Sequence, residues 1–241
     1  NYPNYSQPAN YGKPVSMPSK GSRSAAVAAA VVATIMLVFQ ILFNGSLVEP
    51  IQKLIYDITK DTQVTMLLIY IFVAIEYILG ILLAVYIMKM TKNNSGTIAG
   101  SIYLFIKIVL LISILFILVS IIAEDDIGAT FFTSKGFNIA KNIIIILGFL
   151  AIGILLGQAV NGTAGKTLMF GYVILAVFTL AAFILGLTLK SDYKTLKTII
   201  LIAYILDCVL ALVITIGYYL NIGNYSQTNS NTINYAQEWD Q

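Results

Sequence analysis

Three ionisable side chains lie inside long apolar runs of the sequence: Glu76, Lys107 and Asp207. Counted along a helix at ~1.5 Å per residue, each lies roughly 14 to 18 Å into its run, close to the middle of a membrane. A charge without a partner at that depth is costly. We therefore expect Lys107 to pair with one acid, leaving the other acid either protonated or facing water.

These three residues, here called the charge cluster, fit two kinds of role. In the first, the cluster is a relay for protons or small cations, in which one carboxyl group changes its protonation while Lys107 supplies a compensating charge. In the second, an ion pair fixes the register of the helices, and the remaining acid is neutral and bonded to a tyrosine such as Tyr77 or Tyr204. The apolar runs hold few other polar residues and no proline, whereas many transporters have broken helices. Both roles remain open from the residues alone.

Few residues for other chemistry are present. The chain has no histidine and a single cysteine, Cys208, so it lacks the commonest metal ligand and general base and cannot form an internal disulfide. We expect no catalytic residue, no metal and no cofactor, and hence not an enzyme. The net charge of +3 is spread as short flanks around the apolar runs without a continuous basic face, so nucleic acid is not an expected partner.

The elements that must position the charge cluster follow from composition. Apolar residues make up 59% of the 241-residue chain and charged residues 10%, unlike a soluble domain. Six apolar runs are long enough to cross ~30 Å of hydrocarbon. We predict an all-α integral membrane protein, with a six-transmembrane-helix bundle over residues 25–220. The runs cover residues 25–43, 64–88, 98–123, 143–160, 168–189 and 198–220.

The first run is expected to be a retained anchor. It follows a polar segment, and no small-residue cleavage site of the kind that ends a signal peptide appears before Asn44.

A short amphipathic helix is expected between the first two runs, over about residues 46–61. Apolar residues recur there at helical spacing, charged residues four apart lie on another face, and Ser46 and Glu49 have capping-box spacing. The pattern favours a helix lying flat in the membrane interface, and the alternative is a solvated connecting helix. The apolar residues are Leu47, Ile51, Leu54, Ile55 and Ile58, and the charged ones are Glu49, Lys53, Asp57 and Asp61.

The two polar tails, residues 1–24 and 221–241, have a composition of their own. The first is rich in Pro, Tyr and Asn, and the second in Asn, Gln, Ser and Tyr. Neither has enough apolar surface to offset its ordering entropy, so each is expected to be disordered alone and ordered by contact with other membrane protein subunits.

Small residues predict where helices approach closely. Gly153 and Gly157 form a Gly-x-x-x-Gly pair with Gly148 nearby, and Gly96 and Gly100 repeat the spacing. We expect these glycines to pack helices within the bundle.

Orientation is weakly marked, because positive residues divide almost evenly between the two sides. An even number of spans places both termini on one side. Sequons for N-glycosylation on that side favour termini that face outward. These sequons begin at Asn4, Asn93, Asn161 and Asn224, with Asn44 on the opposite side.

The sequence predicts two functions. The first is a non-catalytic structural or accessory subunit of a larger membrane complex, in contact with lipid and with other subunits. The alternative is a transporter or channel for protons, small cations or a small polar solute that uses the charge cluster.

Overall fold

The computed structural model describes residues 20–44, 48–91, 93–123, 134–160, 162–188 and 193–238, and side chains for 24–42, 49–91, 93–123, 134–160, 163–187 and 195–217. Within these ranges the chain is helical and contains no strand. The helices are α1 (Lys20–Asn44), α2 (Val48–Thr59), α3 (Thr62–Thr91), α4 (Asn94–Ala123), α6 (Lys135–Ala159), α7 (Gly162–Thr188) and α8 (Tyr193–Glu238).

Six of these helices are long and apolar enough to cross a membrane: α1, α3, α4, α6, α7 and α8, with mean hydropathies of 2.5 to 3.1 over their spans. Their outward faces carry large apolar side chains such as Val119, Leu147 and Phe170, which fits contact with lipid rather than water. The predicted all-helical, multi-pass membrane architecture is therefore confirmed.

Several helices begin before the apolar runs do. α6 starts at Lys135 rather than at 143, because Ser134 caps it and its side chain accepts a hydrogen bond from the backbone N–H of Phe137 at 3.3 Å. Asn93 caps α4 in the same way, through the N–H of Gly96 at 2.7 Å. A search for apolar runs does not detect polar first turns of this kind.

The end of the chain differs from the expectation of a disordered tail over 221–241. α8 continues to Glu238, although its apolar span ends at Gly217. Extending a helix that is already nucleated avoids the cost of nucleation, and this segment contains no proline to end the helix. The predicted N-terminal tail lies mostly outside the described residues, since α1 begins at Lys20.

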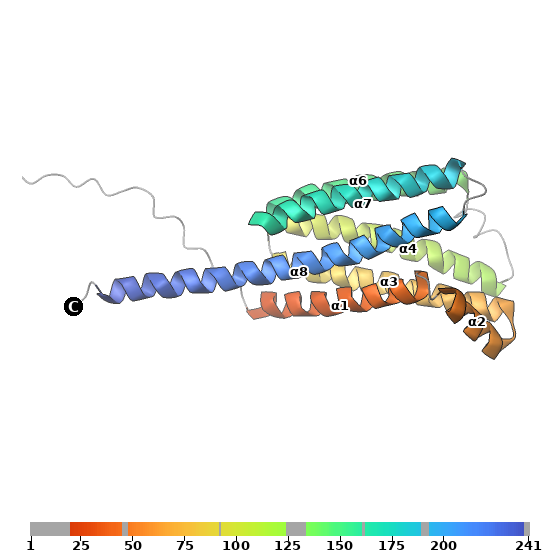
Figure 1. Ribbon diagram of the computed structural model, residues 1–241, viewed down its shortest axis with the longest axis horizontal. Coiled ribbons are helices and arrows are strands. Elements are labelled where there is room, and N and C mark those ends of the chain that lie inside the picture. Colours follow the sequence, from red (N-terminus) through yellow and green to blue (C-terminus); the bar gives the residue numbers. More distant parts are fainter. Residues whose placement is uncertain are drawn as a thin grey trace, which may run out of the picture.

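The six spanning helices form a closed ring in chain order. Each packs against the spans that precede and follow it, and α8 packs against α1 to close the ring. In Figure 1, α8 leaves the bundle at the end where α1 begins, and α2 lies at the opposite end. These are called the tail end and the α2 end below. In the ring order α4 stands opposite α8, so side chains of these two helices meet across the interior.

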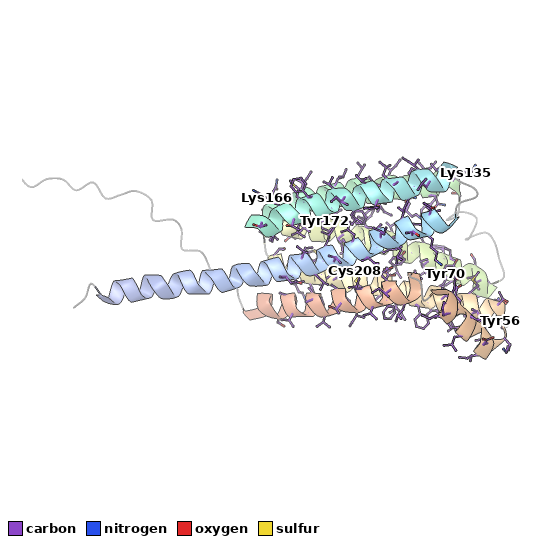
Figure 2. The ribbon with its side chains drawn as sticks, in the orientation of Figure 1. Tyr56, Tyr70, Lys135, Lys166, Tyr172 and Cys208 are labelled. Atoms are coloured by element: carbon purple, nitrogen blue, oxygen red, sulfur yellow. The ribbon has the colours of Figure 1, made fainter. Side chains whose placement is uncertain are left out.

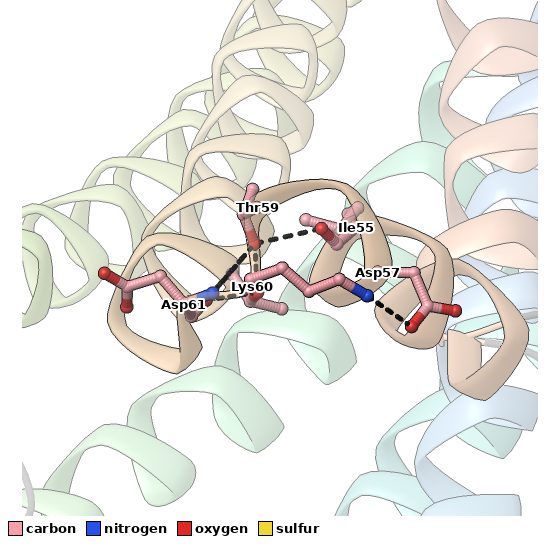
Figure 3. A network of polar contacts seen from close by, with 6 residues as sticks. Ile55, Asp57, Thr59, Lys60 and Asp61 are labelled. Atoms are coloured by element: carbon pink, nitrogen blue, oxygen red, sulfur yellow. Dashed lines mark hydrogen bonds and ion pairs between the residues drawn. The ribbon is translucent and has the colours of Figure 1, made fainter.

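A tight joint connects α2 to α3 (Figure 3). Lys60 adopts a positive φ of 53°, and its N–H bonds to the carbonyl of Tyr56 at 2.7 Å. Asp61 then caps α3 by accepting from the N–H groups of Gln63 at 2.7 Å and Val64 at 3.2 Å. This arrangement fixes the direction in which α2 leaves the bundle.

Packing is much closer in the half of the ring nearer the tail end. The connected apolar core runs there from Ala25 on α1 to Ile214 on α8. Towards the α2 end the packing is looser: among the described side chains, none of residues 177–187 on α7 and none of 195–206 on α8 is fully buried. The charge cluster lies at the boundary between these two halves.

Candidate functional site

Lys107 and Asp207 form a buried ion pair inside the ring. The ammonium nitrogen lies 2.8 Å from Asp207 Oδ2, and the two residues are 2% and 4% exposed. Tyr103, one turn before Lys107 on α4, donates its hydroxyl to the same oxygen at 2.9 Å, and its ring centre lies 5.0 Å from the ammonium. Because α4 and α8 are opposite members of the ring, the pair bridges the interior.

The stem of Lys107 passes over Gly80 of α3. A Cβ added at Gly80 would lie 2.9 Å from Lys107 Cδ and 3.0 Å from Cγ, closer than side chains normally pack. Gly80 therefore makes room for a long cationic side chain to run from α4 across to α8. Sequence reasoning missed this role, although Gly80 lies one helical turn from Glu76, on the same face of α3.

Glu76 is buried, and no described residue forms an ion pair with it. Glu76 is 3% exposed, and its carboxyl group is close enough to both Lys107 and Asp207 to interact electrostatically. The side-chain amide of Gln40 on α1 lies within reach of it. Its Oε1 has no hydrogen-bond partner among the described residues. The structure thus pairs Lys107 with Asp207 and leaves Glu76 as the additional acid.

Tyrosines surround the cluster. The side chains of Tyr77 on α3 and Tyr204 on α8 lie close enough to interact with each other. Tyr172 on α7 is fully buried near Asp207, and its hydroxyl has no partner among the described residues. Figure 2 marks Tyr172 and, on α8, Cys208, the residue after Asp207. Sequence reasoning did not identify Tyr103 as part of the cluster. Its position one helical turn before Lys107 is the sequence signal that could have done so.

Polar atoms in this layer are incompletely satisfied. Oε1 of Glu76, Oδ1 of Asp207 and the hydroxyl of Tyr172 are all buried, and no described residue donates to or accepts from them. Buried polar groups in proteins are almost always bonded, and exceptions call for an explanation. A site with one excess carboxyl group and unused oxygen atoms is chemically suited to bind a proton or a small hydrogen-bonding species.

The predicted packing glycines all lie at close approaches within the chain. A Cβ at Gly100 would meet Met88 Cγ of α3, and one at Gly148 would lie 2.6 Å from Ile106 Cδ1 of α4. Gly153 and Gly157 face α7, where a Cβ would lie 2.8 Å from Tyr172 Cβ and 3.1 Å from Met169 Cβ. Gly96 lies in the first turn of α4, against Thr91 at the end of α3.

Of the predicted sequons, the structure describes the side chain of Asn93 alone. Its Nδ2, the atom that would carry a sugar, donates to the carbonyl of Ala159 at 3.1 Å and so ties the start of α4 to the end of α6. Asn4 and Asn161 lie outside the described residues, as do the side chains of Asn44 and Asn224.

No family model, curated protein or solved structure matches the chain. Any function must therefore be argued from the residues of this chain.

Proposed function

We propose that this protein moves a proton, a small cation or a small polar solute across a membrane through the interior of its six-helix ring. The observation that carries the proposal is the position of the charge cluster. It is built from α3, α4 and α8, at the boundary between a closely packed half and a loosely packed half of the ring. Intramembrane ionisable residues that face a bundle interior commonly mark ion and proton pathways.

The fold favours access to the cluster from the α2 end. α1 ends at Asn44, about one turn beyond Gln40, whereas α3 extends from Glu76 to Thr62 in the same direction. Beyond the cluster, α1 is followed by the shorter, redirected α2, which packs against α1 and α3 and whose described side chains are half-buried or exposed. The tail half is sealed by large buried side chains such as Met36 and Ile152. Access from one side at a time is the property that a transporter requires.

Reconstitution tests this proposal. Proteoliposomes loaded with a pH-sensitive dye and given a potassium diffusion potential are expected to show proton flux above that of protein-free vesicles, and parallel uptake assays with Na⁺ and small polar solutes cover the other substrates. Glu76→Gln is expected to abolish the flux. Glu49→Gln removes a carboxylate on α2 whose side chain is 84% exposed, and it is the matched control. Vesicles that carry none of these substrates at a rate above the protein-free background would contradict the proposal.

A second function, that of a non-catalytic accessory subunit, is supported by the Lys107–Asp207 pair. An ion pair between opposite helices, satisfied further by Tyr103, fixes one arrangement of the ring, as a scaffold requires. The polar tails would then contact other subunits. Purification in mild detergent tests this function: a larger assembly is expected, and a stable lone monomer with protease-sensitive tails would oppose it.

We also propose that α2 lies in the membrane interface. Leu54 and Ile58 are 59% and 75% exposed although they are apolar, which suits contact with lipid. Lys60 and Asp57 form an exposed pair at 3.4 Å near the end of α2. Both termini are proposed to face outward, on the side opposite α2. The variants Lys53→Cys and Ser95→Cys test this orientation. Each is labelled with an impermeant maleimide from each side of sealed vesicles.

A further inference from the structure

We propose that Glu76 carries the transported or exchanged proton, and that Lys107 and Asp207 form a fixed ion pair that does not titrate with it. This inference rests on the proposed function, because it names the ligand and the group that the transport would use.

Charge balance singles out Glu76. The cluster contains two carboxyl groups and one ammonium group. Lys107 lies 2.8 Å from Asp207, which also accepts from Tyr103 at 2.9 Å, and no cation of the described residues lies within 4.0 Å of Glu76. One additional positive charge is therefore needed for the cluster to be neutral, and a proton on Glu76 supplies it. A net charge in the centre of a membrane is strongly unfavourable.

The ligand that fits is a proton rather than a metal ion. Hard cations take about six or more oxygen ligands. The unpartnered oxygen atoms here belong to Glu76, Asp207 and Tyr172 on three different helices, and the ammonium of Lys107 stands beside Asp207, where it would repel a metal ion. Among the described residues no group of three or more His, Cys, Asp or Glu side chains could hold a metal. A proton requires one carboxyl oxygen.

Gln40 suits a site with two protonation states. Its side-chain amide lies within reach of Glu76, and an amide both donates and accepts. It can donate an N–H to the carboxylate or accept the O–H of the carboxylic acid. A partner that only donates would favour the charged form, so the identity of this residue fits a group that exchanges its proton.

The titratable side chains that face Glu76 come from α3 itself and from the helices packed against it. α4 contributes Lys107, and α8 contributes Asp207, Tyr204 and Cys208. α1 contributes the neutral Gln40, and on α3 itself the nearest titratable residue is Tyr77. Among these groups Glu76 is the carboxyl group without an ion-pair partner, so it is the group expected to exchange a proton.

Carbodiimide labelling tests the assignment. Dicyclohexylcarbodiimide reacts with protonated carboxyl groups in apolar surroundings. The reconstituted wild-type protein is treated over a range of pH, and peptides carrying Glu76 and Asp207 are quantified by mass spectrometry. We expect labelling at Glu76, falling about tenfold per pH unit above its midpoint as the protonated fraction falls, and none at Asp207. Asp207→Asn is expected to reduce labelling at position 76, because Lys107 then balances an ionised Glu76, and Glu76→Gln is expected to abolish it.

Infrared difference spectroscopy on the same vesicles provides an independent measurement. The wild-type protein at low pH is expected to show the carbonyl stretch of the protonated Glu76 side chain. This band is expected to be missing from the spectrum of Glu76→Gln. Labelling at Asp207, or no carboxylic acid signal assignable to Glu76 by either method, would overturn the inference. A titrating Glu76 without flux in proteoliposomes would support the proton site and reject transport. Flux that Glu76→Gln leaves unchanged would support transport and reject Glu76 as the carrier of the transported proton.

Discussion

The ammonium group of Lys107 on α4 lies 2.8 Å from Oδ2 of Asp207 on α8, and these two helices stand opposite each other in the ring rather than side by side. The ion pair therefore connects parts of the bundle that helix packing alone does not join. Apolar contacts hold neighbouring helices together, whereas this contact sets the distance across the interior.

Breaking this pair on one side should destabilise the bundle strongly. Lys107→Met leaves a buried carboxylate and Asp207→Asn leaves a buried ammonium, and each is expected to lose about 3–5 kcal/mol of unfolding free energy. The double variant should lose clearly less than the sum, because no unpaired charge remains. Reversible unfolding in mixed detergent micelles provides the measurement.

The exposed pair Asp57–Lys60, at 3.4 Å, is the control for that cycle. Its side chains are largely in solvent, so the same substitutions there should change stability by about 1 kcal/mol or less. Additive losses for Lys107→Met and Asp207→Asn would show that the two residues do not act as a pair.

Two buried tyrosines near Asp207 should respond differently to removal of the hydroxyl. Tyr103 donates to Oδ2 of Asp207, so Tyr103→Phe is expected to cost about 1.5–3 kcal/mol, the range for a bond to a charged group. The hydroxyl of Tyr172 has no partner among the described residues, so Tyr172→Phe should be neutral or slightly stabilising. Equal losses for the two variants would contradict the bonding described for Tyr103.

Gly80 should not tolerate even a methyl group. Gly80→Ala places a carbon 2.9 Å from Lys107 Cδ, and the stem cannot move freely because the ammonium is held by Asp207. A loss of about 1–3 kcal/mol is expected from overpacking. Gly186→Ala on α7 has no atom within 4 Å of the new Cβ and should be neutral or stabilising by up to about 1 kcal/mol. Matching thermal unfolding curves for Gly80→Ala and wild type would refute the steric argument.

The membrane spans were predictable because each is a continuous apolar run long enough to cross the bilayer. Their first turns were not, since Ser134 and Asn93 begin helices through side-chain caps in polar sequence. Continuation of α8 to Glu238 was also missed, because composition reports on burial and not on whether a helix that is already nucleated continues.

The charge cluster was predictable as a set of residues but not as a geometry. Depth along a helix shows that Glu76, Lys107 and Asp207 lie at similar levels, yet it does not show which acid contacts the lysine. That choice depends on α4 and α8 facing each other across the ring, on the space above Gly80 and on the hydrogen bond from Tyr103. Each of these depends on tertiary packing between residues far apart in the sequence.

Close packing of α6 against α7 should depend on Gly153. A methyl group there would lie 2.8 Å from Tyr172 Cβ and 3.2 Å from the backbone carbonyl of Met169, so the two helices would have to separate. Gly153→Ala is expected to lose about 1–3 kcal/mol of unfolding free energy. Gly136→Ala on the same helix meets nothing within 4 Å and should leave stability unchanged or raise it by up to about 1 kcal/mol. Because Tyr172 lies near Asp207, a shift of α7 should also change carbodiimide labelling or proton flux in Gly153→Ala and not in Gly136→Ala. Equal behaviour of the two alanine variants would mean that α6 and α7 do not pack through this glycine.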